Sequence, residues 1–182
     1  MKTIHVPKPS DKLDVYCDYS AVAKAVGGKL VITRKDEDGV QKNLLAGHFS
    51  IKLTKHQQKW WPCEGEALAV RLTAQHFSPH IRENENITKI HTDNMPSVHA
   101  WKRLKTGAFS SSARVASFLT GLSTLRVELV HNPDKNNMVS DYNSRHPYTC
   151  SEERCQICQF SSKLEFIGDL KLGSRFTSLW KE

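Results

Sequence analysis

The sequence contains no long hydrophobic run. No stretch approaches the roughly 18 apolar residues that span a bilayer, and residues 1–10 hold no apolar segment typical of a secretory signal. These absences indicate an intracellular protein, in the cytoplasm or the nucleus, without a membrane partner. Internal repeats and low-complexity tracts are also missing, and 182 residues with 38% hydrophobic content fit one globular core with room for a short second module.

Cysteines are few and odd in number. The chain has five, of which Cys17 and Cys63 stand apart and three lie close together near the carboxyl end. An odd count without a secretory signal argues against a disulfide framework and indicates a reducing compartment.

Acidic residues are absent from two long stretches. Residues 39–63 hold four lysines and no acid, and residues 94–127 hold five basic residues and no acid. The formal net charge is +7 and the pI is near 9.2. Such surfaces either contact phosphates or simply remain solvated, and of these two interpretations the charge pattern favours a polyanionic partner.

The pattern of apolar residues predicts an α/β fold. Strands are expected at 13–18, 29–33, 40–53, 87–92 and 125–131. Helices are expected at 63–77, along the apolar stripes 98–104 and 115–122, and at 136–145. A charged turn is expected at 35–39, and Asn94 is a candidate helix cap. Strands in series followed by alternating helices indicate a mixed sheet with helices packed on it.

Four carboxylates lie at the ends of these elements. Asp18 ends the first strand and Asp93 follows the fourth; Glu66 lies at the start of the first helix and Asp141 lies in the last. Four acids in one site repel each other unless cations neutralise them. A pair of Mg²⁺ ions about 3.5–4 Å apart would do so, and would stabilise both oxygens of a phosphodiester displacement. On spacing alone, scattered surface acids are an equally good interpretation.

Five motifs surround these acids in a fixed order. They are Val15–Ser20, Gly27–Leu30, Phe49–Leu53 with Trp60–Ala69, Thr92–Asn94 and Asn136–Arg145. Together they resemble the ribonuclease H domain of reverse transcriptases from retroviruses and long-terminal-repeat retrotransposons, over residues 13–147. The segment after Asp18 departs from the family pattern, because it is about two residues longer and has Ala23 where glycine is typical. Ser140 also replaces the usual alanine.

The resemblance implies a ribonuclease H-like fold, with a five-stranded mixed sheet whose first three strands are antiparallel, flanked by helices. It implies that the four carboxylates are catalytic and bind two Mg²⁺ ions, with Mn²⁺ as a substitute. Glu66 fits better than Glu64 because it directly precedes an Ala-Leu-Ala run. His131 matches a mobile histidine that helps the product leave, and a capping or surface histidine is the alternative.

The implied activity is hydrolysis of the RNA strand of RNA–DNA hybrids during retroelement reverse transcription. The candidate substrate-binding residues are Ser20, Asn94, Lys52, Lys55 and Lys59. The first two would read 2′-hydroxyl groups, and the lysines would hold phosphates. Trp60 and Trp61 are candidates for stacking, although we expect at least one of them in the core.

The partners implied are the hybrid itself and the polymerase and integrase regions of a longer polyprotein. The chain has no polymerase-type Asp-Asp pair, protease triplet or complete integrase of its own. Two other hypotheses stay open. One is a catalytically silent ribonuclease H-like module that binds nucleic acid or protein, and the other is a zinc-centred interaction module.

A cluster of soft metal ligands follows the last predicted helix. His146, Cys150, Cys155 and Cys158 fall within thirteen residues and form an acceptable set for one structural Zn²⁺. Against this, His146 can simply end the helix, and buried free thiols are ordinary. We therefore divide the chain into an arm at 1–11, a ribonuclease H-like domain at 12–147 and a Cys-rich extension at 148–182.

Overall fold

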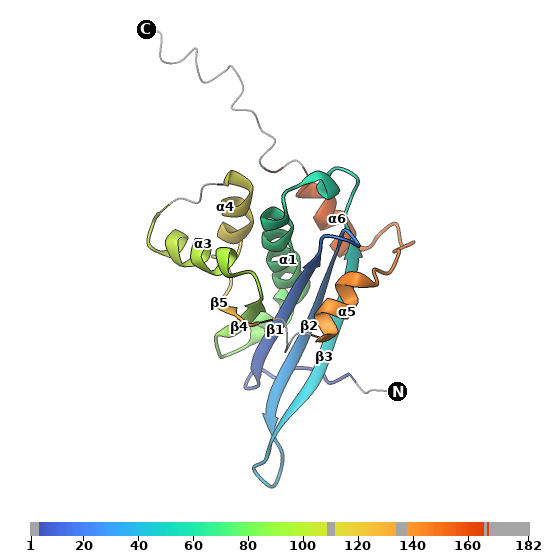
Figure 1. Cartoon of the computed structure of the whole chain (residues 1–182). Helices are drawn as coiled ribbons and strands as arrows, with labels where there is room; N and C mark the ends of the chain where they lie inside the picture. Colours follow the sequence, from blue (N-terminus) through green and yellow to red (C-terminus); the bar gives the residue numbers. More distant parts are fainter. Residues whose placement is uncertain (1–3, 109–111, 134–137, 166, 168–182) are drawn as a thin grey trace.

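The computed structural model describes residues 4–108, 112–133, 138–165 and 167, and a five-stranded mixed sheet forms its centre (Figure 1). The strands are β1 (Lys12–Ser20), β2 (Ala25–Lys35), β3 (Gln41–Lys52), β4 (Thr88–Thr92) and β5 (Val127–His131). Their order is β3-β2-β1-β4-β5, with β1, β2 and β3 antiparallel and β4 parallel to both β1 and β5. The predicted fold class is confirmed.

Two tight turns make β1, β2 and β3 a meander. The predicted charged turn is present, and Gly39 takes the left-handed conformation there with φ of 78°. The turn after β1 comprises residues 21–24, and Lys24 rather than Ala23 has positive φ, at 52°. The amide of Ala23 instead donates to the Ser20 hydroxyl at 3.1 Å. The longer first turn therefore closes without glycine.

The helices cover both faces of the sheet. They are α1 (Pro62–His76), α2 (Ser78–Glu83), α3 (Met95–Lys105), α4 (Ala113–Thr120), α5 (Met138–Arg145) and α6 (Gln156–Lys163), with a 3-10 turn η1 at Gln57–Lys59. Successive strand residues point to opposite faces. A Cβ on Gly28 would meet Thr73 of α1, whereas one on Gly27 would meet the Ser140 backbone of α5. These two helices therefore pack on opposite faces.

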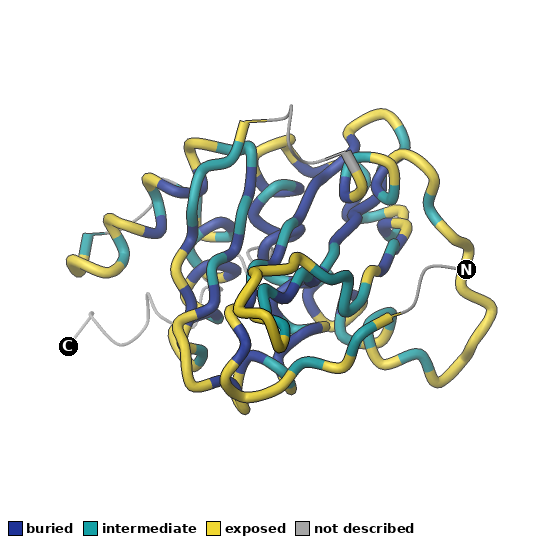
Figure 2. The backbone as a smooth tube through the Cα atoms, turned by 90° about the horizontal axis from the view of Figure 1, so that it is seen from below, coloured by how far each residue is buried: buried dark blue, intermediate teal, exposed yellow. Residues whose placement is uncertain are grey.

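The hydrophobic core lies between the sheet and α1. Leu13, Val15 and Cys17 alternate along β1 and have no exposed surface, and they face the apolar side of α1. In Figure 2 the buried residues follow the strands and the central helix, and the outer turns are exposed. Within the described part of the chain, no helix is both long and apolar enough to cross a bilayer.

Most helix boundaries match the predictions. Asn94 caps α3, because its Oδ1 accepts the Ser97 amide at 2.9 Å. Helix α5 was expected from residue 136, but residues 134–137 lie outside the described residues. The short elements η1, α2 and α6 were not predicted. The first two span only three and six residues, which is too short for a helical stripe to show.

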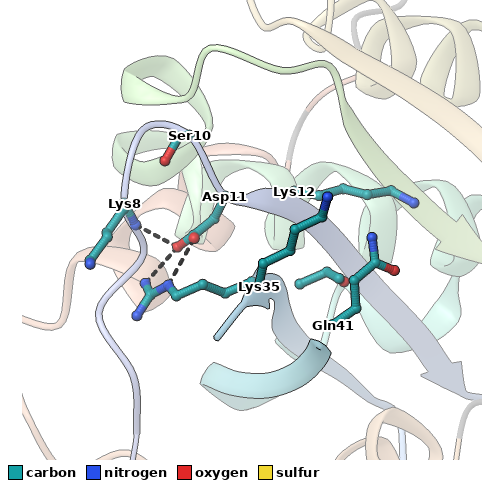
Figure 3. Close-up of a pocket in the computed structure, with 8 residues that line it drawn as sticks. Lys8, Ser10, Asp11, Lys12, Lys35 and Gln41 are labelled. Carbon is teal, nitrogen blue, oxygen red and sulfur yellow. Dashed lines mark hydrogen bonds and ion pairs between the residues drawn. The ribbon is translucent and has the colours of Figure 1, made fainter. Parts of the chain in front are cut away.

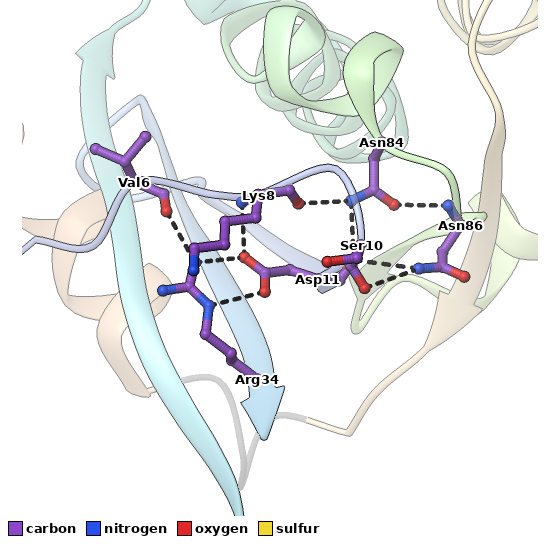
Figure 4. Close-up of polar contacts among 7 residues, drawn as sticks. All are labelled: Val6, Lys8, Ser10, Asp11, Arg34, Asn84 and Asn86. Carbon is purple, nitrogen blue, oxygen red and sulfur yellow. Dashed lines mark hydrogen bonds and ion pairs between the residues drawn. The ribbon is translucent and has the colours of Figure 1, made fainter. Parts of the chain in front are cut away.

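The N-terminal arm is fastened to the sheet by a polar network (Figure 4). Arg34 donates to both carboxylate oxygens of Asp11, at 2.9 and 2.6 Å, and to the Val6 carbonyl at 3.0 Å. Asn84 donates to the Asp11 carbonyl at 2.8 Å. The hydrogen bond from Arg34 is the main reason that the pKa of Asp11 is lowered, against the opposing effect of burial.

A cavity of about 490 Å³ lies beside this network and is lined by Lys8, Lys12 and Lys35 among others (Figure 3). It opens at the amino end of β1. Asp18 is six positions after Lys12 along β1, and a rise of about 3.3 Å per residue puts the two about 20 Å apart. This cavity is therefore remote from the predicted carboxylate site.

Candidate active site

Asp18 and Asp93 lie level with each other on neighbouring strands. In the parallel pairing of β1 with β4, Tyr16 stands opposite His91. Asp18 and Asp93 each follow two residues later, and adjacent strands are about 4.8 Å apart. Both side chains line one cavity of about 170 Å³ at the carboxyl ends of the strands.

Helix α5 brings Asp141 to the same cavity. Its approach depends on Gly27, where a Cβ would lie 2.5 Å from the Ser140 carbonyl oxygen and from the Ser144 amide nitrogen. The Ser144 hydroxyl donates to the Asp18 carboxylate, so that the two carboxylate-bearing elements are joined directly. Ser144 was not among the predicted site residues, although it is the serine of the motif Asn136–Arg145.

Glu66 comes from the opposite face of the sheet. Its neighbour Gly65 packs directly on the Tyr19 ring, where an added Cβ would lie 2.6 Å from ring carbons. Burial raises the pKa of the Cys17 thiol well above its usual value, and the charges of Glu66, Asp18 and Asp93 raise it further. The contact of Gly65 with Tyr19 therefore places the start of α1 beside the carboxyl end of β1.

Glu64 has structural partners outside the carboxylate cavity, which agrees with the prediction of Glu66 rather than Glu64 as the site residue. Its Oε1 accepts from Arg114 Nη1 at 2.8 Å and its Oε2 accepts from the Trp61 amide at 3.0 Å. The Arg114 guanidinium also lies 4.3 Å from the centre of the Trp60 ring. Glu64 therefore anchors the start of α1 to α4, and Arg114 has a structural role rather than lying on the open basic surface.

Asp141 forms an ion pair with Arg145, which was not among the predicted site residues. Arg145 Nε donates to Asp141 Oδ1 at 2.6 Å, one helical turn along α5, and both side chains are largely exposed. The i, i+4 spacing was the available signal. Asp18, Asp93 and Asp141 line this rim and Glu66 does not, and among the described residues no three of these carboxylates have oxygens mutually within 4.8 Å. Carboxylate oxygens are nevertheless the hard ligands that Mg²⁺ prefers.

His131 lies next to Asp93. It pairs with Thr92 across β4 and β5, and its Nε2 is 3.1 Å from the Asp93 carbonyl oxygen. His131 therefore lies next to Asp93 but contacts its backbone, and the function of His131 stays a prediction.

The predicted substrate-binding residues fall into two groups. Ser20 lines the carboxylate cavity, whereas Asn94 lines a neighbouring cavity and uses its Oδ1 to cap α3. Lys52 pairs with a β2 residue that itself pairs with Ser20, so that two strand spacings, about 10 Å, separate the backbones. Lys55 and Lys59 follow on the exposed connection to α1.

The two tryptophans divide as expected. Trp60 is 7% exposed and packs on Phe118 with ring centres 5.7 Å apart, whereas Trp61 is 75% exposed at the start of α1. The core assignment of one tryptophan is confirmed, and Trp61 is the one available for stacking.

The structure gathers three of the four predicted soft ligands. The Sγ atoms of Cys150, Cys155 and Cys158 all lie within 4.8 Å of one another. His146 is not part of this group. Its ring stacks on Tyr142 with centres 4.2 Å apart, and its Nδ1 lies 3.0 Å from the Tyr142 carbonyl oxygen. The prediction that His146 completes the set is not borne out by this arrangement, because the histidine stays on the last turn of its helix.

The sheet order and the acids at the ends of β1 and β4 define a ribonuclease H-like protein. Residues 8–123 match the model of the RNase H-like domain found in reverse transcriptase, and the chain belongs to this family. The match includes Asp18, Glu66 and Asp93, whereas His131 and Asp141 lie beyond it.

Solved structures share the fold. The chain is similar to the foamy viral protease-reverse transcriptase dRH in complex with double-stranded DNA, with a TM-score of 0.52 and 12% identity over 81% of this chain and 25% of that one. It is also similar to LC11-RNase H1 in complex with an RNA/DNA hybrid, with a TM-score of 0.50 and 16% identity, and to RNase H1 from the archaeon Halobacterium salinarum NRC-1, with 0.50 and 11%. Both alignments cover 72% of this chain and 93% of the other. A comparison with curated proteins found no match.

Proposed function

We propose that this chain hydrolyses the RNA strand of RNA–DNA hybrids with two divalent ions, Mg²⁺ or in its place Mn²⁺. The observation that carries the proposal is the shared cavity of Asp18, Asp93 and Asp141, with Glu66 beside the same end of β1. Membership of the reverse transcriptase RNase H-like family supports the same class of activity.

The carboxylates would hold the ions from three directions: the sheet, which carries Asp18 and Asp93, helix α1, which carries Glu66, and helix α5, which carries Asp141. When bound, the ions would activate the attacking water and stabilise the leaving oxygen. Ser144 orients Asp18 by donating to it, which fixes the carboxylate before substrate arrives. His131 is held at the end of β5 by its contact with the Asp93 carbonyl oxygen, and its proposed role is to help the product leave.

Residues on and near the cavity support a nucleic-acid duplex as the substrate. Ser20 lines the carboxylate cavity beside Asp18 and would contact a 2′-hydroxyl group, whereas the exposed Lys52, Lys55 and Lys59 would contact phosphates. Contacts to 2′-hydroxyls select RNA, and contacts to phosphates add affinity that falls with salt. The structural relative LC11-RNase H1 was solved with an RNA/DNA hybrid, which is consistent with this substrate class.

The domain would act inside the cell as part of a longer polyprotein. The foamy viral relative carries protease and reverse transcriptase regions in one chain, of which the similar part is 25%. Polymerase and integrase regions would then hold the hybrid that this domain cleaves. The boundaries proposed for the domain, residues 12–147, enclose all four carboxylates.

The test is cleavage of labelled hybrid with Mg²⁺ by wild type, Asp93→Asn and the control Asp14→Asn. Asp14 is on the same sheet, paired with His91 at 2.8 Å, but does not line the carboxylate cavity. We expect Asp93→Asn to lose at least about 100-fold in rate, as when one strong electrostatic contact leaves an active site. The Asp14 variant should keep its activity. Cleavage by Asp93→Asn at the wild-type rate would exclude the metal-carboxylate mechanism.

A silent binding module is the second candidate, and the ion pair between Arg145 and Asp141 favours it. A cation already beside Asp141 competes with metal there. This candidate predicts hybrid binding that weakens steeply with salt, with no cleavage in Mg²⁺ or Mn²⁺.

A further inference from the structure

Three thiols gather between α5 and α6, away from the carboxylate cavity. Cys150 lies in the connection, Cys155 caps α6 and Cys158 lies in its first turn. Their sulfur atoms are mutually within 4.8 Å, although four residues separate Cys150 from Cys155. All three are free thiols. Cys63, which lines the cavity near Asn94, and the buried Cys17 are not members of the group.

We propose that Cys150, Cys155 and Cys158 bind one Zn²⁺ ion as thiolates, with water as the fourth ligand. Zinc binds thiolate sulfur at about 2.3 Å in tetrahedral geometry, which places sulfur atoms about 3.8 Å from each other. Sulfur atoms already within 4.8 Å need to move by only about 1 Å to reach that spacing. Among the described residues no fourth His, Cys or carboxylate atom joins the group at this distance, so a water completes the tetrahedron.

A disulfide explains the cluster less well. A disulfide joins two sulfur atoms and leaves the third without a role, whereas a metal engages all three. The three cysteines also come from one short segment, residues 150–158, in which Ile157 and Cys158 pack against the hydrophobic core but residues 150–154 are exposed. Segments of this kind are commonly ordered by a metal.

The ion would hold the amino end of α6 in place on the domain. Further along, Gln57 Nε2 donates to the Ser161 carbonyl at 2.8 Å, Arg71 lies 5.2 Å from the centre of the Phe160 ring, and Leu164 is 7% exposed. The carboxyl half of α6 is therefore packed, and the thiol cluster is at its other end. Zinc would tie this helix to the connection from α5, the helix that carries Asp141.

The test measures metal in the full chain, purified under reducing conditions with zinc supplied. We expect about one zinc ion per wild-type chain and loss of most of it from Cys155→Ser and Cys158→Ser. The control Cys63→Ser should keep its zinc, as should His146→Ala and Asp93→Asn. A second measurement replaces zinc with Co²⁺, whose thiolate charge-transfer absorption should weaken in Cys150→Ser because two thiolates remain instead of three.

The zinc proposal fails if the wild-type chain holds no zinc, or if Cys63→Ser loses zinc as completely as Cys158→Ser. A disulfide between two of the three cysteines in the reduced preparation would also exclude it. Because metal content is measured directly, retention of zinc by inactive Asp93→Asn separates this proposal from the nuclease proposal.

Discussion

Replacing Gly27 with alanine tests how α5 is positioned. The added Cβ would lie 2.5 Å from both the Ser140 carbonyl oxygen and the Ser144 amide nitrogen, and ordinary contacts begin at 3.4 Å. Both neighbours are backbone atoms, so the helix must retreat as a body by about 1 Å. We expect this overpacking to cost about 1–3 kcal/mol of unfolding free energy, which leaves most of a domain's usual stability.

The functional cost should exceed what the lost stability explains. Asp141 moves with α5, and a displacement of about 1 Å in an active site can cost on the order of 100-fold in rate. We expect Gly27→Ala to cleave hybrid about 10- to 100-fold more slowly and to need more Mg²⁺ for half-maximal rate. Urea unfolding, followed by circular dichroism, gives the stability, and cleavage is measured where the variant is fully folded.

Gly39 supplies the matched control. Its φ of 78° makes alanine strained there, but no described atom lies within 4 Å of the added Cβ. Gly39→Ala should therefore lose about 1 kcal/mol and keep its cleavage rate. If Gly27→Ala were as active as wild type, the argument that α5 positions Asp141 would be refuted. If Gly39→Ala lost as much activity, stability alone would explain both.

Four further variants test the site and the arm. Glu66→Gln should abolish cleavage and stay stable, whereas Glu64→Gln should cleave normally and lose about 1–3 kcal/mol in urea unfolding, because a buried partner of an arginine is removed. Asp11→Asn should lose about 1–2 kcal/mol at pH 7, since Arg34 holds the pKa of Asp11 below its usual value. Ser144→Ala should raise the Mg²⁺ concentration needed for cleavage, because Asp18 loses its donor.

The Asp11 and Ser144 variants each have a control. The lowered pKa means that the Asp11 contribution is present above the unfolded pKa, near 3.8, and disappears as pH falls through the folded value. The stability gap to Asp11→Asn should therefore close in acid, and a constant gap would contradict the assignment. Ser50 donates to the Asn143 carbonyl at 2.6 Å and also anchors α5. Ser50→Ala should leave the Mg²⁺ requirement unchanged, and an equal rise in both serine variants would show that Asp18 orientation is not the cause.

Local patterns predicted the parts of the fold that depend on local physics. The alternating apolar residues of β1 and the Asn94 cap depend on spacing within one element, and both are confirmed. The second strand was expected only from residue 29, whereas β2 begins at Ala25 and includes both glycines of the pair Gly27–Gly28. The pairing of Glu64 with Arg114 joins residues 50 positions apart, which no periodicity encodes. Helix α6 was missed although Ile157, Phe160 and Leu164 recur at helical spacing and pack on the core, so this signal was present in the sequence.

The candidate site divides in the same way. Asp18 and Asp93 come together because parallel strands align their carboxyl ends, which makes their meeting predictable once the strands are known. Asp141 is different, because its position depends on a docked helix and on the absence of a side chain at Gly27. Only the family resemblance, not the spacing, brought it into the predicted set.

The ion pair between Asp141 and Arg145 is too weak to make the silent binding module the better hypothesis. The side chains are 42% and 65% exposed, and i, i+4 pairs of this kind contribute about 0.3–0.5 kcal/mol. A carboxylate that joins a divalent ion with two or three others gains far more than this, because the like charges then attract a common cation instead of repelling one another. Arg145 can release Asp141 by rotating into solvent, where its charge is fully hydrated. Arg145 lines the same cavity as Asp141, so that under the proposed function its released guanidinium would be available to a phosphate of the hybrid.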